Sequence, residues 1–216
     1  MEALTHILIT VWNEVTNMKK KDITSKDLLL CFLYSSGINS CNNEPIVGRT
    51  KLTKMMYLFE KEIIASFFND NIEITLPEFV PYYFGPFSKQ LFEDLSFFQS
   101  IGMIIAEKTN IPLSFADKVE SDNAFDSNDD IWHEAFFENE YEYYESSYYL
   151  SESGKKYVEE NIWNYFTDMQ KDKLKAFKAQ INRISLDALL RYVYTKYPED
   201  AKKSKIADKY LNKADS

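Results

Sequence analysis

The sequence has few of the residues on which most catalytic and metal sites depend. Its 216 residues include two histidines, two cysteines and five glycines. Cys31 and Cys41 cannot form the disulfide framework of a small secreted domain, so a reducing cytoplasm is the expected location. His6 and His133 lie far apart, and no second histidine follows His133-Glu134 four residues on, which excludes a zinc-protease motif. A glycine-rich loop that would hold phosphates is also missing from the sequence.

Long apolar runs are lacking as well. No run reaches the roughly 18 residues that a membrane-spanning helix needs, and no basic segment precedes an apolar one near residue 1. The aspartates between residues 122 and 130 lack the glycine and the terminal glutamate of a calcium loop. We therefore expect neither a membrane protein nor a secreted one, no metal, no cofactor and no enzymatic activity. The 45% hydrophobic content predicts a globular chain.

Acidic residues are concentrated in one segment. Residues 117–145 hold eleven acids and one base, Lys118, whereas the rest of the chain holds 23 acids and 24 bases. The net charge of −9 is therefore local and does not exclude nucleic acid elsewhere on the surface. The segment is also rich in aromatic residues, which a loop that only improves solubility does not need. The aromatic residues predicted to anchor a basic protein partner are Trp132, Phe136, Phe137, Tyr141, Tyr143 and Tyr144. The alternative is a loop whose aromatic side chains pack on the body of the protein.

Residues 81–104 give the clearest indication of the order of strands and helices. This stretch predicts a strand, a Gly-Pro corner, an amphipathic helix, a glycine stop and a second strand. Gly85 permits a sharp turn, and Pro86 suits the first turn of a helix because its missing N–H would have no partner there. Gly102 is expected to end the helix in the left-handed conformation. The core-facing positions recur at spacings of three to four residues: Phe87, Leu91, Leu95 and Phe98.

A second strand and helix follow the acidic segment. Tyr148–Leu150 predict a short strand, and Ser151 or Ser153 is placed to cap the helix after it. A strand, a divergent insert, a second strand and a helix are the order in which a winged helix closes its wing. We predict a mainly α protein with a small β component, in which flanking helices surround a winged-helix-like core. The predicted parts are an N-terminal helix (1–24), the core (25–160) with its acidic aromatic insert (117–147), and a C-terminal helical extension (161–216).

Three segments resemble a known family. They are Ile-Val-Gly-Arg-Thr-Lys-Leu-Thr-Lys-Met-Met-Tyr (46–57), Tyr-Phe-Gly-Pro-Phe-Ser-Lys-Gln-Leu (83–91) and Leu-Leu-Arg-Tyr-Val-Tyr-Thr-Lys-Tyr-Pro (189–198). In this order they resemble the YwgA-type proteins of bacteria and archaea, which in turn resemble the SocA-like, or Panacea, antitoxin domain. The resemblance implies a helical, winged-helix-like fold and a role as antitoxin, regulator or defence component that binds a toxin or another protein. It carries no catalytic residues.

A winged-helix regulator that binds DNA is the alternative function. Arg49, Lys51, Lys54 and Lys89 lie near the starts of two helices and are the candidates for phosphate contacts. The outward side chains of the second helix would be Lys89, Gln90, Glu93, Asp94 and Gln99. Two carboxylates in that set would repel phosphates, which weakens this alternative. A homodimer is compatible with either function.

Overall fold

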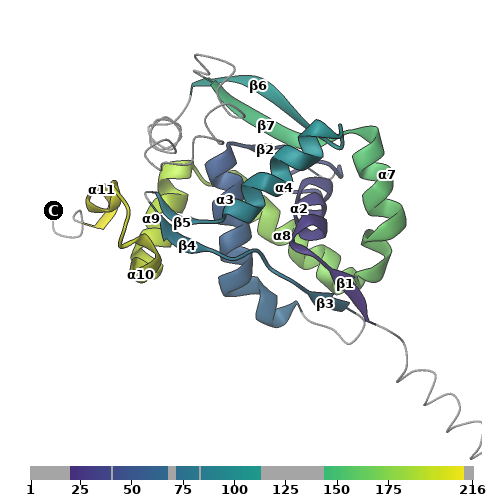
Figure 1. Ribbon diagram of the computed structural model, residues 1–216, viewed down its shortest axis with the longest axis horizontal. Helices are drawn as coiled ribbons and strands as arrows, with labels where there is room; N and C mark the ends of the chain where they lie inside the picture. Colours follow the sequence, from purple (N-terminus) through teal and green to yellow (C-terminus); the bar gives the residue numbers. More distant parts are fainter. Residues whose placement is uncertain (1–19, 40, 68–71, 83, 113–143, 212–216) are drawn as a thin grey trace, which may run out of the picture.

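The computed structural model describes residues 20–39, 41–67, 72–82, 84–112 and 144–211. Its central elements follow the order of a winged helix, in which three helices precede a wing and a short strand lies between the first two. Their bounds are α2 (Ser25–Tyr34), β2 (Ile46–Val47), α3 (Arg49–Leu58), α4 (Lys89–Ser100), β6 (Ile104–Pro112) and β7 (Tyr144–Leu150). The three strands form an antiparallel sheet in the order β2-β7-β6, which lies along the upper side of Figure 1. The predicted mainly α fold with a small β component is confirmed, and its elements follow the order expected of a winged-helix-like core.

Smaller elements lie between α3 and α4. Helix α3 continues through a π-helical turn (Phe59–Ile63) into a 3-10 turn (Ile64–Ser66). Strand β3 (Ile72–Ile74) pairs in parallel with β1 (Lys21–Ile23), and β4 (Val80–Tyr82) forms a hairpin with β5 (Gly85–Phe87). Of the N-terminal helix predicted over residues 1–24, residues 1–19 lie outside the described residues, and residues 21–23 are strand β1.

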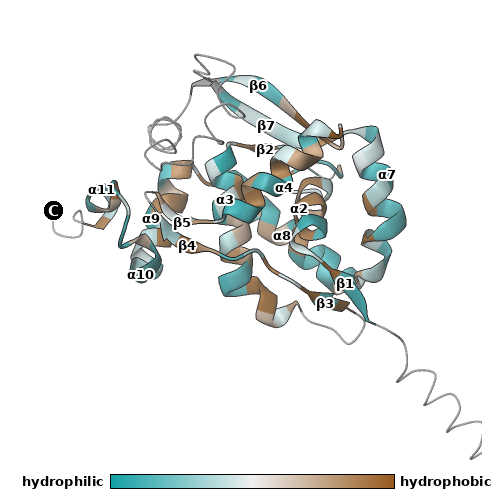
Figure 2. Ribbon diagram, viewed as in Figure 1, coloured by the Kyte–Doolittle hydropathy of each residue, from teal (hydrophilic) through white to brown (hydrophobic). Residues whose placement is uncertain are grey.

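The C-terminal part of the chain is helical. Its elements are α7 (Glu152–Asn161), a 3-10 turn (Trp163–Tyr165), α8 (Asp168–Arg183), α9 (Leu186–Lys196), α10 (Pro198–Ala201) and α11 (Ala207–Leu211). Helix α7 is mostly hydrophilic and buries only Gly154 and Val158, as a helix at the surface does (Figure 2). Across the described residues, no helix has both the length and the apolar composition that crossing a bilayer requires.

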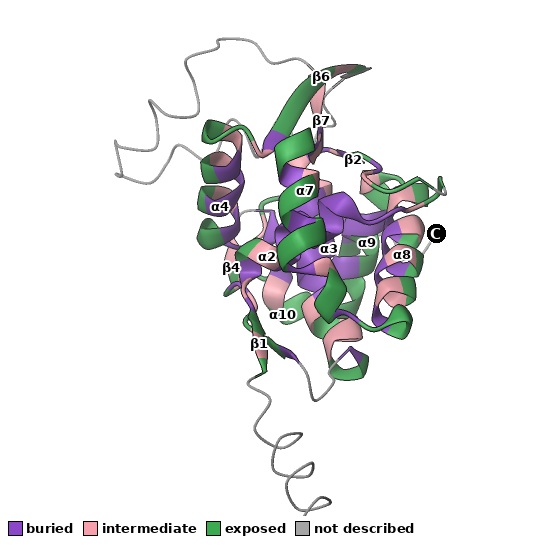
Figure 3. Ribbon diagram, turned by 90° about the vertical axis from the view of Figure 1, so that its right-hand side faces the viewer, coloured by how far each residue is buried: buried purple, intermediate pink, exposed green. Residues whose placement is uncertain are grey.

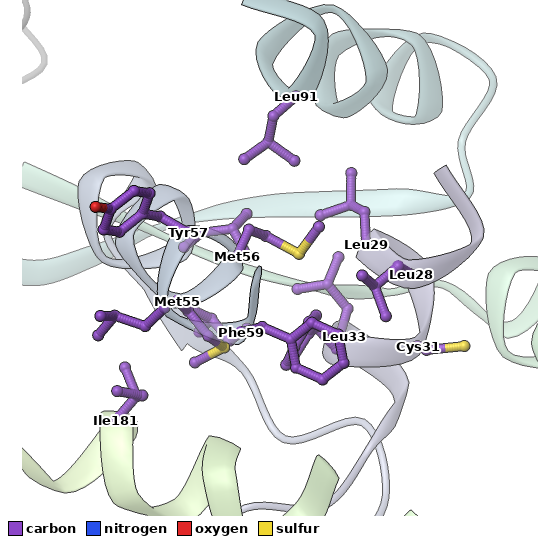
Figure 4. Packing of buried hydrophobic residues seen from close by; sticks show 14 of the residues in the cluster. Leu28, Leu29, Cys31, Leu33, Met55, Met56, Tyr57, Phe59, Leu91 and Ile181 are labelled. Atoms are coloured by element: carbon purple, nitrogen blue, oxygen red, sulfur yellow. The ribbon is translucent and has the colours of Figure 1, made fainter. Parts of the chain in front are cut away.

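The core surrounds α2 and α3. Every residue of α2 from Leu28 to Tyr34 is buried, and so is every residue of α3 from Leu52 to Leu58. Helices that are buried on all sides lie at the centre of a fold rather than on its surface. Figure 4 shows Leu28, Leu29 and Leu33 of α2 beside Met55 and Met56 of α3, with Ile181 of α8 below them. Because α8 and α9 add residues to this same cluster, the predicted C-terminal extension is part of the core.

The predicted cap at Ser151 is confirmed, but the predicted start of α4 is wrong. Ser151 caps α7, and Thr24 and Asp27 form a capping box at the start of α2. Helix α4 begins at Lys89 because the Ser88 hydroxyl accepts a hydrogen bond from the backbone N–H of Leu91. Pro86 and Phe87 therefore lie in strand β5 rather than in the first helical turn.

Hairpin β4–β5 explains why Pro86 suits a strand here. Pro81 lies opposite Pro86, so neither residue of the pair has an N–H to leave unpaired. Gly85 turns with a φ of +83°, and Gly102 ends α4 with a φ of +71°, as the sequence predicts for a left-handed stop.

A buried lysine connects α8 to the loop between α2 and β2. Lys178 is fully buried, and its Nζ donates to the carbonyl oxygens of Leu33 (3.0 Å), Ser35 (2.7 Å) and Glu44. Burial lowers the pKa of Lys178 to about 7. Three carbonyl acceptors nevertheless match the three N–H donors of an ammonium group, which supports the charged form.

The side chain of Glu44 organises the same loop. Its carboxylate accepts hydrogen bonds from the backbone N–H groups of Gly37 (3.2 Å), Ile38 (3.0 Å) and Asn39 (2.6 Å). The side chain of Asn182 on α8 donates a fourth at 2.8 Å. Burial works against ionisation of Glu44, but these hydrogen bonds, together with nearby Lys178, hold its pKa below the ordinary value.

Replacing the buried lysine tests this arrangement. We expect Lys178→Met to lower the free energy of unfolding by about 3 kcal/mol or more, because three buried carbonyls lose their donor. Lys175→Met, one turn earlier on α8 with a side chain 42% exposed, is the matched control and should change stability by less than about 0.5 kcal/mol. Urea unfolding followed by circular dichroism measures both. Equal effects of the two substitutions would contradict the structural role of Lys178.

Substituting two glycines that have similar backbone angles distinguishes the cost of backbone strain from the cost of a steric clash. A Cβ atom at Gly85 would lie 2.6 Å from Cε1 of Tyr194, whereas a Cβ atom at Gly102 meets nothing within 4 Å among the described atoms. Gly102→Ala should therefore cost only the left-handed strain, about 1 kcal/mol. Gly85→Ala should cost at least about 1 kcal/mol more, because the Tyr194 ring must move. Thermal unfolding of both variants provides the comparison, and equal melting temperatures would show that Gly85 does not pack on Tyr194.

Candidate functional site

The predicted partner-binding aromatics fall mostly where the structure gives no description. Trp132, Phe136, Phe137, Tyr141 and Tyr143 lie outside the described residues, as does most of the acidic insert. Tyr144 is the first residue of strand β7, opposite Pro112 of β6. The segment predicted as insert thus includes four residues, 144–147, that belong to the sheet. Docking through the insert stays a prediction.

The four basic candidates do not form one exposed basic face. Lys54 is fully buried, and its Nζ donates to the carbonyl oxygen of Pro86 at 3.0 Å, so it cannot reach a phosphate. The Nζ of Lys51 donates to the carbonyl oxygen of Ile184 at 2.8 Å. The guanidinium of Arg49 lies 4.9 Å from the ring centre of Phe92. Lys89 is exposed, with its Nζ 4.0 Å from the Glu93 carboxylate.

Asp94, predicted to point outward, is buried between α4 and the start of α2. The Ser25 hydroxyl donates to its Oδ2 at 3.2 Å, and the Lys26 ammonium lies 3.7 Å from its Oδ1. Burial raises the pKa of Asp94, and the Ser25 hydrogen bond and the charge of Lys26 oppose that rise. The exposed Gln90 amide donates to the same Ser25 hydroxyl at 2.9 Å. Asp94 therefore joins two helices, and it does not contribute to the outer face of α4.

The outer face of α4 carries apolar side chains that the sequence analysis did not single out. Figure 3 shows α4 with a buried side toward the body of the protein and an exposed side away from it. Phe97 is 47% exposed and Ile101, one turn later, is 50% exposed. Ile105, just inside strand β6, is 38% exposed. We call these three residues the α4–β6 apolar face. The sequence contains a signal for the outer apolar residues. Phe97 and Ile101 are four positions apart and form a second stripe beside the core-facing stripe that includes Phe98.

An aromatic cluster lies at the other end of α4. The rings of Tyr82 and Phe87 stack with centroids 5.0 Å apart, and Phe87 lies 4.8 Å from Phe92. The Arg49 guanidinium covers the Phe92 ring, so residues of β4, β5, α4 and α3 meet here. All four side chains are partly buried, and their contacts with one another fasten the hairpin to the two helices.

The two cysteines and the potential metal ligands are the groups that a catalytic or metal site would use. Burial raises the pKa of the Cys31 thiol well above its ordinary value, and the nearby Asp27 carboxylate raises it further. Cys41 is exposed, in the loop before β2. Among the described residues, no three histidine, cysteine, aspartate or glutamate side chains come together as metal ligands would.

No protein-family model, curated protein or solved structure matches the chain. The resemblance drawn from the three sequence segments therefore stays an expectation.

Two adjacent phenylalanines test whether the α4–β6 apolar face is dispensable for folding. Phe98 is 6% exposed and belongs to the core, so Phe98→Ala should cost about 3–5 kcal/mol. Phe97→Ala should cost about 1 kcal/mol or less, because the ring is about half exposed. Its described ring contacts are with the Nζ of Lys26, 5.0 Å from the ring centre, and with the ring of Phe98, whose centroid is 5.3 Å away. Urea titrations of the two variants measure the difference. A Phe97 cost as large as that of Phe98 would mean that Phe97 serves packing rather than an outer surface.

Proposed function

We propose that this chain is a non-enzymatic protein-interaction module that works in the cytoplasm. Its role would be that of an antitoxin or of a component in a regulatory or defence system of bacteria or archaea, as the sequence resemblance suggests. The partner is a protein, and it covers the α4–β6 apolar face. The acidic aromatic insert would enlarge that contact.

The observation that carries this proposal is the chemistry of α4. In a winged-helix protein that binds DNA, the third helix of the core enters the major groove and presents basic and polar side chains. Helix α4 occupies that position, yet Phe97 within it and Ile101 at its C-cap are exposed, and its one lysine, Lys89, lies beside Glu93. An apolar surface with few charges suits the centre of a protein–protein contact.

DNA binding remains the second candidate, and the sheet order β2-β7-β6 behind α4 favours it. Arg49, Lys51 and Lys89 would then supply the phosphate contacts, without the buried Lys54. Binding of that kind weakens steeply as salt concentration rises, because bound counterions are released from the DNA.

Affinity purification from the native host separates the two functions. The bait proteins are the full chain, the double variant Phe97→Glu/Ile101→Glu, and Met169→Glu as a control that alters a 69% exposed side chain on α8. All preparations are treated with nuclease and compared with untreated ones. We expect a protein partner to stay bound to the full chain and to Met169→Glu, and to be lost from the double variant, because two carboxylates cannot be buried in an apolar contact.

Recovery of nuclease-sensitive nucleic acid without any protein would overturn the proposal in favour of the DNA-binding regulator. A deletion limited to residues 117–143 tests the insert separately, because it leaves strand β7 complete. Loss of the partner from this deletion would extend the contact to the insert.

A further inference from the structure

Strand β6 is the outer strand of its sheet. Within the described residues its only strand neighbour is β7, and it is the uppermost strand in Figure 1. It runs for nine residues, from Ile104 to Pro112, which makes it the longest strand described. A strand of this length at the edge of a sheet presents backbone N–H and C=O groups to any extended chain that comes alongside.

The pairing of β7 shows which β6 groups face outward. Leu150 exchanges hydrogen bonds with the side chain of Asn43, through its N–H at 2.8 Å and its carbonyl at 2.9 Å, so its backbone points away from β6. Leu150 lies opposite Ile104, and in antiparallel pairing the hydrogen-bonding direction alternates from residue to residue. Ile105 and Glu107 therefore bond to β7. Ile104 and Ala106 direct their backbone groups to the other edge of β6, where the described residues place no strand.

The side chains near this edge indicate which residues an added strand would carry. Ile105 and Glu107 are exposed and project from the same face of the sheet, two residues apart. Glu107 also accepts a hydrogen bond from Tyr149 at 3.1 Å. A strand added at the edge would place one of its side chains beside Ile105 and another beside Glu107. An apolar residue and a basic residue, two positions apart, complement this pair.

We infer that the open edge of β6 takes up an extended segment of the partner protein as an additional strand, with a basic residue beside Glu107 and an apolar residue beside Ile105. This inference rests on the proposed function and specifies how its partner binds. Ile105 follows Ile101 by four positions, across the turn at Gly102, so the added strand would begin close in the chain to that contact. Main-chain hydrogen bonds supply the affinity in this mode of recognition, and alternate side chains supply the selectivity.

A second copy of this chain fits the edge less well. In antiparallel self-pairing, residues whose backbone points outward must lie opposite each other, so even-numbered residues pair with even-numbered ones and odd with odd. Glu107 would then lie opposite Met103, Ile105, Thr109 or another Glu107, depending on the register. None of these residues is basic, and a second Glu107 would repel the first.

Ala106→Pro blocks the edge without disturbing the sheet. The N–H of Ala106 points away from β7, so proline removes a donor only from the open edge, where proline is tolerated. Ala106→Ser keeps the N–H and is the matched control. Circular dichroism and thermal unfolding should show that both variants fold like the full chain.

The probe is a displayed library of random short peptides, selected on the full chain. We expect the selected peptides to share a basic residue and an apolar residue two positions apart. These peptides should bind Ala106→Ser with the same affinity as the unsubstituted chain. Their affinity for Ala106→Pro should be about tenfold lower or more, because proline removes one hydrogen-bond donor and its ring obstructs the edge. Selection on Glu107→Lys should replace the basic residue with an acidic one.

Peptides that bind the full chain and Ala106→Pro equally, or a library that yields none, would overturn the inference. A full chain that is dimeric in sedimentation and becomes monomeric with Ala106→Pro would overturn it too, by assigning the edge to a second copy. If the host partner is lost from Phe97→Glu/Ile101→Glu but retained by Ala106→Pro, the proposed function stands and strand addition fails. If neither variant loses a partner, the proposed function fails.

Discussion

One buried ammonium group determines how the C-terminal helices belong to the fold. The last carbonyls of a helix have no partner within the helix, and a positive charge at that end stabilises it. Helix α2 has no basic residue in its last turn. Lys178 supplies that charge from α8, and the same ammonium also binds the carbonyls of Ser35 and Glu44 in the loop that leads to β2. Without α8, these buried oxygens would lack their donor, so the winged-helix core is incomplete without the helices that follow it.

The three segments on which the sequence resemblance rests contact one another in the fold, and a second buried lysine makes one of these contacts. Lys54, from the first segment, bonds to the carbonyl of Pro86 in the second. Gly85, also in the second, approaches the ring of Tyr194 in the third so closely that a Cβ atom would not fit. The hydroxyl of Tyr57 donates to Asp200 at 2.6 Å, and its ring meets that of Tyr197. These residues hold α3, β5 and α9 together. Packing is therefore a sufficient reason for the residues that the three segments contain, and no shared chemical activity is needed to explain them.

The sequence predicts the elements of this fold better than its surface. Local signals suffice for the capping box at Thr24, the left-handed stop at Gly102 and the cap at Ser151, because each depends on residues within one helical turn. The sequence predicts a start of α4 three residues too early, because proline fits both a first helical turn and a strand position that needs no N–H donor. It also predicts Lys54 and Asp94 at the surface, because charged residues are mostly exposed. Only long-range contacts, with Pro86 and with Ser25, show that they are buried.

The same long-range contacts define the surface that is left for a partner. Lys51 and Lys54 of α3 bind backbone carbonyls of the protein itself. On α4, Asp94 binds α2, and the exposed charged side chains are Lys89 and Glu93, which lie beside each other. The helix shows its hydrophobic residues in two stripes: Leu91, Leu95 and Phe98 face the core, and Phe97 and Ile101 face outward. At Gly102 the chain turns from the end of the outer stripe into β6, so Ile105 of the edge strand follows Ile101 by four positions. A partner that covers the helix face therefore has to extend past this one turn to reach the strand.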